Sequence, residues 1–283
     1  MSILLHPALR YADLRRFRPG FVPRKDGIFG LGDGRAGALR PVMSACVVAA
    51  VLGWALAALA ADPAASDSSN VPNRLSQADR EAGWVLLFDG KSTDEWRGFG
   101  RTAFPTEGWK VEDGCLQHAE GLRGGDIITT NTFTNFELRF DWKIGLGANS
   151  GVKYFILESR GSPIGHEYQV IDDERHPDGK RGPKWQTGGF YDVLPPSATR
   201  PKPPGQFNES RIVVRGNSVE HWLNGARVLA YELGSDQLRA AIAVSKFRDV
   251  QGFGTAVTGH ILLQDHGDAV WFRNIKIRTI PVP

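Results

Sequence analysis

Residues 136–144 alternate strictly between apolar and charged side chains. The apolar set is Phe136, Leu138, Phe140, Trp142 and Ile144, and the charged set is Glu137, Arg139, Asp141 and Lys143. Successive side chains of a β-strand point to opposite faces of the sheet, so the pattern gathers the large apolar groups on one face and the charges on the other. The segment therefore predicts a strand of an antiparallel sheet with one face in the core and one in solvent.

Shorter runs rich in β-branched and aromatic residues follow the same logic, and Asp-Gly, Gly-Asn and Asn-Gly pairs between them favour tight turns. Strands are expected at 84–88, 109–112, 115–117, 136–144, 211–215, 219–223, 227–231, 260–264 and 270–278. A helix is expected from Ser235 to Phe247, and a short capped one from Ser76 to Ala82. The sequence thus predicts an all-β fold, a two-sheet antiparallel sandwich of jelly-roll kind with one short helix insertion; a closed barrel is the alternative.

Charge is distributed unevenly between the N-terminal leader and the rest of the chain. Residues 1–61 hold eight Lys and Arg against three Asp, a balance of +5. The remainder holds 26 basic and 28 acidic residues, a balance of −2, so the leader accounts for the formal net charge of +3. Binding to duplex nucleic acid needs clustered cations that displace counterions. A nearly neutral body therefore argues against a nucleic-acid partner.

An uncharged run rich in Ala, Val and Leu follows the basic leader, from Val42 to Ala61. It contains Ala58-Leu59-Ala60, the pattern of a signal peptidase site, and predicts a periplasmic or secreted protein that meets the membrane only through its signal peptide. A retained anchor is the alternative, because about 20 apolar residues can span a bilayer. Met43 is an alternative start of the chain. We expect a leader with signal peptide at 1–61, a linker and short helix at 62–82, and a β-sandwich domain at 83–283.

Residues 149–173 hold the first candidate for a functional site. Two β-rich runs on either side of a Gly- and Pro-containing turn at 160–163 are expected to form adjacent antiparallel strands. In the second run Glu167 and Gln169 share one face, while Tyr168 and Val170 point the other way. A carboxylate beside an amide is a candidate site, although a solvated strand face is the commoner meaning of such alternation.

The strand expected at 260–264 supplies a second set of polar groups. His260, Leu262 and Gln264 share a face there, and His266 follows beside a Gly turn. If this strand lies next to Glu167, a general base, a carboxylate and two amides converge in one groove. Taken singly, His266 is equally an ordinary turn histidine, and Gln264 a sheet-edge amide.

Two lysines and two aromatic residues complete the candidates for substrate contact. Lys153 and Lys246 are candidate cations for a developing oxyanion, although single lysines are more often solvated. Trp185 and Tyr191 lie in a stretch rich in Gly and Pro. Aromatic rings stack on the faces of sugars, but such residues also close the rim of a sandwich.

An acidic segment with a histidine is a candidate for a metal site. Asp172, Asp173 and His176 could hold a hard divalent cation. Neither an EF-hand nor a zinc-site spacing is present in the sequence, so a solvated charged loop is the alternative. A divalent cation is accordingly an open expectation for the cofactor.

Seven short motifs occur in this order: Leu87-Phe88-Asp89-Gly90, Asn149-Ser150-Gly151-Val152-Lys153-Tyr154, Glu167-Tyr168-Gln169-Val170-Ile171-Asp172, Trp222-Leu223-Asn224-Gly225, Ser245-Lys246-Phe247, Gly259-His260-Ile261-Leu262-Leu263-Gln264-Asp265-His266-Gly267 and Phe272-Arg273-Asn274-Ile275. Together they resemble the 3-keto-disaccharide hydrolase family over about residues 83–281. The resemblance implies a concanavalin A-like lectin/glucanase fold and a bacterial secreted or periplasmic protein that acts on, or binds, carbohydrate. Some members of this family cleave 3-keto-glycosides.

Two mechanisms of glycosidic cleavage make different demands on these residues. A retaining glycosidase needs two carboxyl groups about 5–5.5 Å apart, which acids at alternating strand positions supply. Those positions here hold Glu167, Gln169 and Ile171. Elimination at a 3-keto sugar needs instead a base for the acidified C2 proton, a group that stabilises the enolate and an acid for the leaving oxygen.

The elimination mechanism assigns roles as follows. We expect His266 or Glu167 as the base, Lys153 or a bound metal as the enolate stabiliser, and Asp172 as the acid or an orienting group. Contacts to an oxidised glucoside or disaccharide are expected from Gln169, Gln264, Tyr191, Trp185 and Lys246. The expected function is an exported hydrolase or lyase that cleaves 3-keto-glycosides by elimination and hydration. A non-catalytic carbohydrate-binding module, a conventional glycoside hydrolase and an exported structural or adhesion protein are the alternatives.

Overall fold

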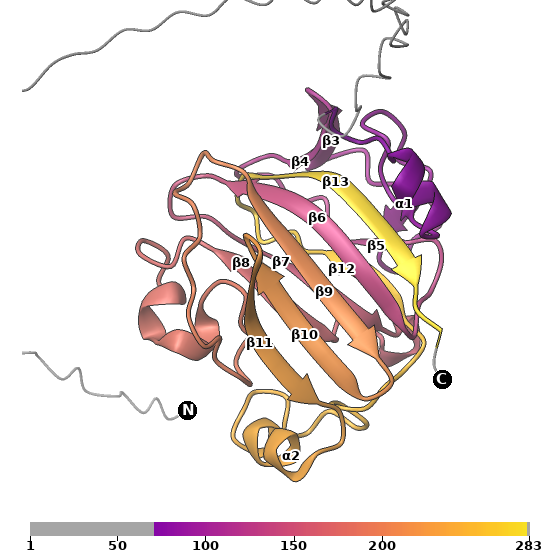
Figure 1. The fold of residues 1–283 in the computed structure, drawn as a ribbon. Coiled ribbons are helices and arrows are strands. Elements are labelled where there is room, and N and C mark those ends of the chain that lie inside the picture. Colours follow the sequence, from indigo (N-terminus) through magenta and orange to yellow (C-terminus); the bar gives the residue numbers. More distant parts are fainter. Residues whose placement is uncertain (1–70, 282–283) are drawn as a thin grey trace, which may run out of the picture. The chain divides into compact units, whose positions relative to one another are not determined.

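The computed structural model describes residues 71–281 of the chain (Figure 1). The predicted signal peptide, the alternative start and the first part of the predicted linker fall outside these residues. Within residues 71–281, the strands form an eight-stranded and a five-stranded antiparallel sheet. No helix in this range is long and apolar enough to cross a membrane.

The larger sheet is built around β6 and β13. Its order is β11 (Ala226–Glu232), β10 (Ser218–Leu223), β9 (Asn208–Arg215), β6 (Phe136–Ile144), β13 (Val270–Thr279), β4 (Cys115–His118) and β3 (Trp109–Glu112), with β1 (Val85–Leu86) also on β13. The alternation in β6 has the predicted consequence, because its five apolar side chains are buried. Glu137 departs from the pattern and is buried as well.

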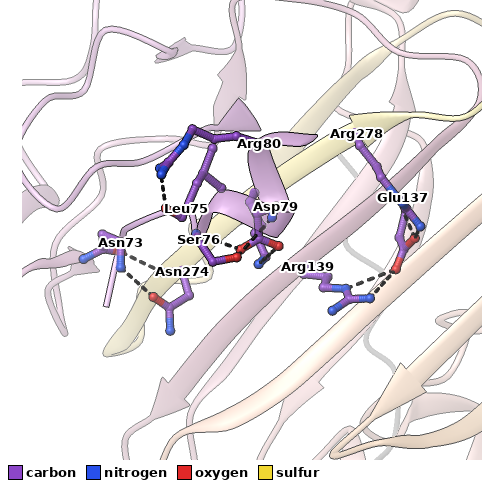
Figure 2. Close-up of polar contacts among 10 residues, drawn as sticks. Asn73, Leu75, Ser76, Asp79, Arg80, Glu137, Arg139, Asn274 and Arg278 are labelled. Carbon is purple, nitrogen blue, oxygen red and sulfur yellow. Dashed lines mark hydrogen bonds and ion pairs between the residues drawn. The ribbon is translucent and has the colours of Figure 1, made fainter. Parts of the chain in front are cut away.

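Glu137 is compensated by arginines on its own and neighbouring strands. Arg139 and Arg278 donate to its two carboxylate oxygens (Figure 2), and Arg211 lies 3.4 Å away. Burial alone would raise the pKa of Glu137, but the hydrogen bonds from Arg278 and Arg139 lower it below its ordinary value. The negative charge of Glu137 can therefore be buried at this sheet surface because arginine side chains pair with it.

The smaller sheet carries the sequence-predicted site. Its order is β2 (Trp96–Gly98), β5 (Ile127–Thr129), β12 (His260–Leu263), β7 (Asn149–Ile156) and β8 (His166–Ile171). The predicted pairing of β7 with β8 is confirmed, with Lys153 opposite Glu167. Ile261 and Leu263 point into the core, as expected. The two sheets together confirm the predicted sandwich.

The expectation that the Glu167 face of β8 is solvated is wrong. Glu167 is 4% exposed and Gln169 is fully buried. The cause is the segment after β8, which returns along the free edge of this strand. Tyr191 N donates to Glu167 O, and Gly188 N donates to Gln169 O. This covering segment contains two short 3₁₀ helices but no strand, so strand periodicity carries no sign of it.

Buried polar groups connect the two sheets across the core. Tyr154 on β7 bonds to His221 on β10 (2.8 Å) and to Tyr231 on β11 (2.6 Å), and Tyr231 bonds in turn to His166 on β8 (2.9 Å). His221 Nδ1 lies 2.9 Å from the Gly188 carbonyl, which fixes this nitrogen as the donor and Nε2 as the acceptor. Burial lowers the pKa of His166 to about 3 and that of His221 to about 4. Both rings are therefore neutral near pH 7, and His221 can hold the Gly188 segment in place.

The helices lie at the two ends of this domain. In α1 (Gln77–Glu81) Ser76 and Asp79 form the predicted capping box (Figure 2). In α2 (Asp236–Ala243) Ser235 is the N-cap, but the helix ends earlier than the expected Phe247. It ends there because Ser245 Oγ bonds back to Ile242 O and accepts from Phe247 N, which turns the chain away from the helix axis.

The segment before α1 is tied to the outer face of the larger sheet. Asn73 and Asn274 exchange two hydrogen bonds from backbone N–H to side-chain oxygen, of 2.6 and 2.8 Å (Figure 2). Asn274 sits with φ 53° at a bulge of β13, a conformation that Asn adopts more readily than most residues. These bonds hold Asn73 against the larger sheet.

Candidate active site

Glu167 is the centre of the candidate site, on the outer face of the five-stranded sheet. Its neighbour on β7 across the register is Lys153, and Lys153 Nζ lies 3.8 Å from Glu167 Oε2. Burial raises the pKa of Glu167, and the charges of Lys153 and Lys246 offset part of this effect. A carboxyl group with a raised pKa, held next to a cation in a water-poor place, is suited to proton transfer.

Gly151 explains why the Asn-Ser-Gly sequence precedes Lys153. A Cβ atom at position 151 would lie 2.6 Å from Glu167 Oε1. Its φ lies outside the left-handed range, so the backbone itself does not require glycine there. Glycine is needed at this position because the carboxylate occupies the space of a side chain.

Asp126 is a second carboxyl group of the site, and sequence reasoning missed it. It directly precedes β5, and its Oδ1 accepts a hydrogen bond of 2.8 Å from Asp265 N. Burial raises the pKa of Asp126, and Lys153 is the strongest charge opposing this. Lys153 is likewise the strongest charge acting on Glu167. The charge of Lys153 therefore acts to lower the pKa of two carboxyl groups, one on β8 and one just before β5.

Tyr191 and Lys246 complete this cluster. Lys246 Nζ lies 4.1 Å from the centre of the Tyr191 ring, and the Tyr191 hydroxyl donates to Asp178 Oδ2 (2.7 Å). Burial lowers the pKa of Lys246 and raises that of Tyr191. We call Asp126, Lys153, Glu167, Tyr191 and Lys246 the outer-face cluster.

The two amide side chains predicted to contact the sugar, Gln169 and Gln264, differ in whether they already have hydrogen-bond partners. Gln169 Nε2 donates to Trp185 O (3.4 Å) and its Oε1 accepts from Val170 N (3.1 Å), so its amide supports the turn at 183–185. Gln264 donates its backbone N–H to Gly151 O. Its side-chain Oε1 is buried and, among the residues described, has no hydrogen-bond partner. Gln264 is thus the amide available to a ligand.

The Trp185 ring, predicted to contact the sugar, has cationic side chains next to it. Arg181 and Lys184 stand 4.2 and 4.5 Å from the centre of its ring. Its indole Nε1 is buried without a partner within residues 71–281. The nitrogen can therefore donate to a ligand hydroxyl only if the neighbouring side chains shift.

His266 lies just beyond β12, which ends at Leu263, so it is placed by a turn at Gly267 and not by strand alternation. Its Nδ1 is 3.3 Å from Asp268 Oδ2, and its ring is 5.5 Å from that of His176. Gln264 N bonds to Gly151 O, and Gly151 lies next to the Glu167 carboxylate, whereas the approach of His266 to Glu167 stays a prediction.

Asp172 and Asp173 have other contacts. Asp172 accepts backbone N–H groups from residues 147, 174 and 175. Burial alone would raise its pKa, but these bonds lower it. Asp173 accepts from Thr187 N and Oγ1, and burial raises its pKa. Both line a cavity of about 610 Å³ together with Trp142 and the Pro-rich residues 199–204.

The predicted metal set of Asp172, Asp173 and His176 is therefore wrong as a group. His176 converges instead with His266 and Asp268, which we call the His–Asp group. Within residues 71–281 the ligand atoms of these three lie within 4.8 Å of one another. The carboxylates of Asp172 and Asp173 are instead held away from His176 by backbone N–H groups and by Thr187.

The cavity of about 450 Å³ beside α1 is a weaker candidate for the site. Four of its charged side chains are paired with each other, Lys276 with Asp79 (2.8 Å) and Arg273 with Asp141 (3.2 Å). Charged side chains that already pair with each other do not need a ligand to balance their charge. The outer-face cluster, with its buried carboxyl group and two lysines, lies instead on the five-stranded sheet.

Comparison with known proteins decides the family. The model of the 3-keto-alpha-glucoside-1,2-lyase-like domain matches residues 83–278. The chain belongs to the 3-keto-alpha-glucoside-1,2-lyase-like family. A 3-keto-disaccharide hydrolase of Bacteroides thetaiotaomicron is 35% identical over 229 residues, which are 70% of this chain and 79% of the relative.

Solved structures agree with this assignment to the 3-keto-alpha-glucoside-1,2-lyase-like family. A candidate glycosyl hydrolase from Parabacteroides distasonis superposes with a TM-score of 0.68 at 32% identity, covering 75% of this chain and all of the other. A second one from that organism gives 0.53 at 28% identity, covering 70% and 99%. The matched range 83–278 contains the outer-face cluster and the His–Asp group, so both lie within the family domain.

Proposed function

We propose that this protein is a carbohydrate hydrolase that cleaves the glycosidic bond of 3-keto-glycosides by elimination followed by addition of water. The observation that carries the proposal is the buried Glu167 beside Lys153, with a raised pKa. Membership of the 3-keto-alpha-glucoside-1,2-lyase-like family supports the choice of substrate class. An oxidoreductase that makes the 3-keto group would have to act before this protein.

The first step is removal of the C2 proton. A ketone at C3 acidifies this proton, and the Glu167 carboxylate takes it, while the C2–H electron pair passes into an enolate on the C3 oxygen. Lys153, 3.8 Å from Glu167, supplies the positive charge that stabilises this enolate. A preorganised cation in a buried place is worth more than one in water.

The second step breaks the C1–O bond. The enolate electrons return to form a C1=C2 double bond, and the leaving oxygen takes a proton. We assign this proton to Asp126, the second carboxyl group of the outer-face cluster, on the opposite side of β7 from Glu167 in the sheet order. Asp172 is a poor donor, since four hydrogen bonds hold its carboxylate ionised. Water then adds its oxygen to C1 and a hydrogen to C2, which gives net hydrolysis.

Glu167→Gln tests the assignment of the base, on a glycoside and on its 3-keto form. Wild-type protein should release the aglycone from the 3-keto form alone. The variant should lose roughly 10²- to 10⁴-fold in rate, the usual contribution of a general base. Glu158→Gln is the matched control, because this glutamate pairs with Arg97 away from the cluster and should leave the rate unchanged.

Three results would contradict the proposal in different ways. Equal rates on both sugars would replace elimination with ordinary glycosidase chemistry. Sugar binding without turnover would favour a carbohydrate-binding module. A fully active Glu167→Gln variant would place the base elsewhere.

A further inference from the structure

The His–Asp group brings together side chains from two separate loops. His176 lies in the segment after β8, while His266 and Asp268 flank the turn at Gly267 after β12. Each offers one ligand atom, and these atoms lie within 4.8 Å of one another. We propose that this group binds one divalent transition-metal ion of the Mn²⁺, Fe²⁺, Co²⁺ or Zn²⁺ class.

The donor types define the class of ion. Two imidazoles and one carboxylate suit first-row divalent metals, whereas Ca²⁺ and Mg²⁺ prefer oxygen donors alone. Three protein ligands leave coordination positions open for water or for oxygen atoms of a sugar. The three side chains are only partly exposed, so an ion here would be shielded from bulk solvent yet reachable by a substrate.

A buried amide oxygen beside the group is an independent sign of a missing ligand. Asn149 is 3% exposed, and its backbone N–H donates to Asp268 Oδ2 (2.9 Å). Its side chain shares a face of β7 with Gly151 and Lys153. Within residues 71–281 its Oδ1 has no hydrogen-bond partner, which is rare for a buried carbonyl. A metal ion, or water bound to it, would satisfy this oxygen.

Metal binding must replace weak contacts that exist without the ion. His176 Nδ1 accepts from Asp178 N at 3.1 Å, and a neutral imidazole has only one lone pair, so this bond breaks when the ring ligates a metal. The contact between His266 Nδ1 and Asp268 Oδ2 is 3.3 Å, beyond the usual length. Asn149 N–H meanwhile holds the carboxylate in position, as neighbouring groups do in metal sites.

The role of the ion rests on the proposed function, although its binding does not. Asp268 of the group accepts from Asn149 N, and Asn149 shares a face of β7 with Lys153 of the outer-face cluster. When bound, the metal would supply a Lewis acid for the sugar ketone. A ligating His266 has no lone pair left for proton transfer, so Glu167 alone remains as the base.

The test uses Mn²⁺ binding to the chelator-treated mature protein without sugar, followed by the loss of the free Mn²⁺ electron paramagnetic resonance signal. Wild type should bind one equivalent. His176→Ala, His266→Ala and Asp268→Asn should each weaken binding at least tenfold. His260→Ala is the matched control, because this histidine is also near a carboxylate, Glu158 at 3.8 Å, but outside the group.

Circular dichroism and the thermal midpoint without metal show whether each variant is folded. If Asp268→Asn unfolds through its lost contact with Asn149, the two histidine variants still decide the question. Absence of a stoichiometric site, or binding that none of the three substitutions weakens, would overturn the proposal. Intact Mn²⁺ binding with no turnover of 3-keto-glycosides would instead overturn the proposed function and leave the metal site standing.

Discussion

At the scale of single residues, the position of the Glu167 carboxylate depends on the missing side chain of Gly151. The hydrogen atom of glycine leaves the space that Glu167 Oε1 fills, 2.6 Å from where a Cβ would be. The backbone at 151 would accept alanine without strain. The effect of such a substitution therefore falls on the carboxylate.

Gly151→Ala should lower kcat/KM for a 3-keto-glycoside by roughly 10²-fold while the protein remains folded, because a displacement of about 1 Å of a reacting group can cost that much. Gly145→Ala is the control, since a Cβ there meets Ala269 Cβ at an ordinary 3.4 Å. Steady-state kinetics of both variants check this. Undiminished activity in Gly151→Ala would remove Glu167 from the reaction.

Lys153→Met should move the acidic limb of the pH profile of kcat/KM to higher pH. The base must be ionised, and burial already raises the pKa of Glu167. The Lys153 charge opposes that rise, so its removal raises the pKa further and the carboxylate is protonated at a higher pH. Lys110→Met is the control on an exposed lysine. A limb that stays in place, or moves to lower pH, would contradict this account.

At the scale of elements, strand alternation predicted which residues face the core but not what covers the other face. In β6 the predicted inner residues are buried, because a sheet that packs on a second sheet hides one face whatever the connections. For β8 the same reasoning failed at Glu167 and Gln169. The loop that returns along this strand is held by backbone bonds and by the Gly188–His221 contact, neither of which has a sequence period.

Trp142→Ala tests the core of the larger sheet. Trp142 is 1% exposed, and its Nε1 donates to Ser210 Oγ (2.8 Å). Truncation leaves a cavity and removes one of the two hydrogen bonds of the Ser210 hydroxyl, which keeps its bond to Tyr168, so the free energy of unfolding should fall by roughly 3–5 kcal/mol. Urea denaturation of the variant measures it. A loss below about 1 kcal/mol would mean that this ring is not part of the packed interior.

At the scale of the whole molecule, the sequence could predict the partners on neighbouring strands but not those that sheet order brings together. Glu167 and Gln169 share a face by alternation alone. Asp126 joins them only because β12 lies between β5 and β7 in the sheet, an order set by long connections. His176 and His266 likewise meet through two loops distant in sequence. The part of the site that depends on topology therefore required the structure.

Export is a prediction for the complete chain, and it rests on residues outside the described range. The basic leader, the apolar run and Ala58-Leu59-Ala60 predict cleavage near Ala61 or Asp62. N-terminal sequencing of the protein recovered from outside the cytoplasm should begin there. Material that still carries residues 1–40 would show that the leader is retained.

Deuterium incorporation tests the elimination mechanism most directly. In heavy water, elimination removes the C2 hydrogen and the added water supplies a new one, so the released 3-keto sugar should carry deuterium at C2 from the first turnovers. Unreacted substrate and an enzyme-free sample correct for spontaneous exchange next to the ketone. Glu167→Gln should slow the formation of labelled product, whereas Glu158→Gln should not. Product that retains its original hydrogen at C2 during initial turnover would contradict removal of that proton by Glu167 and, with it, the proposed reaction.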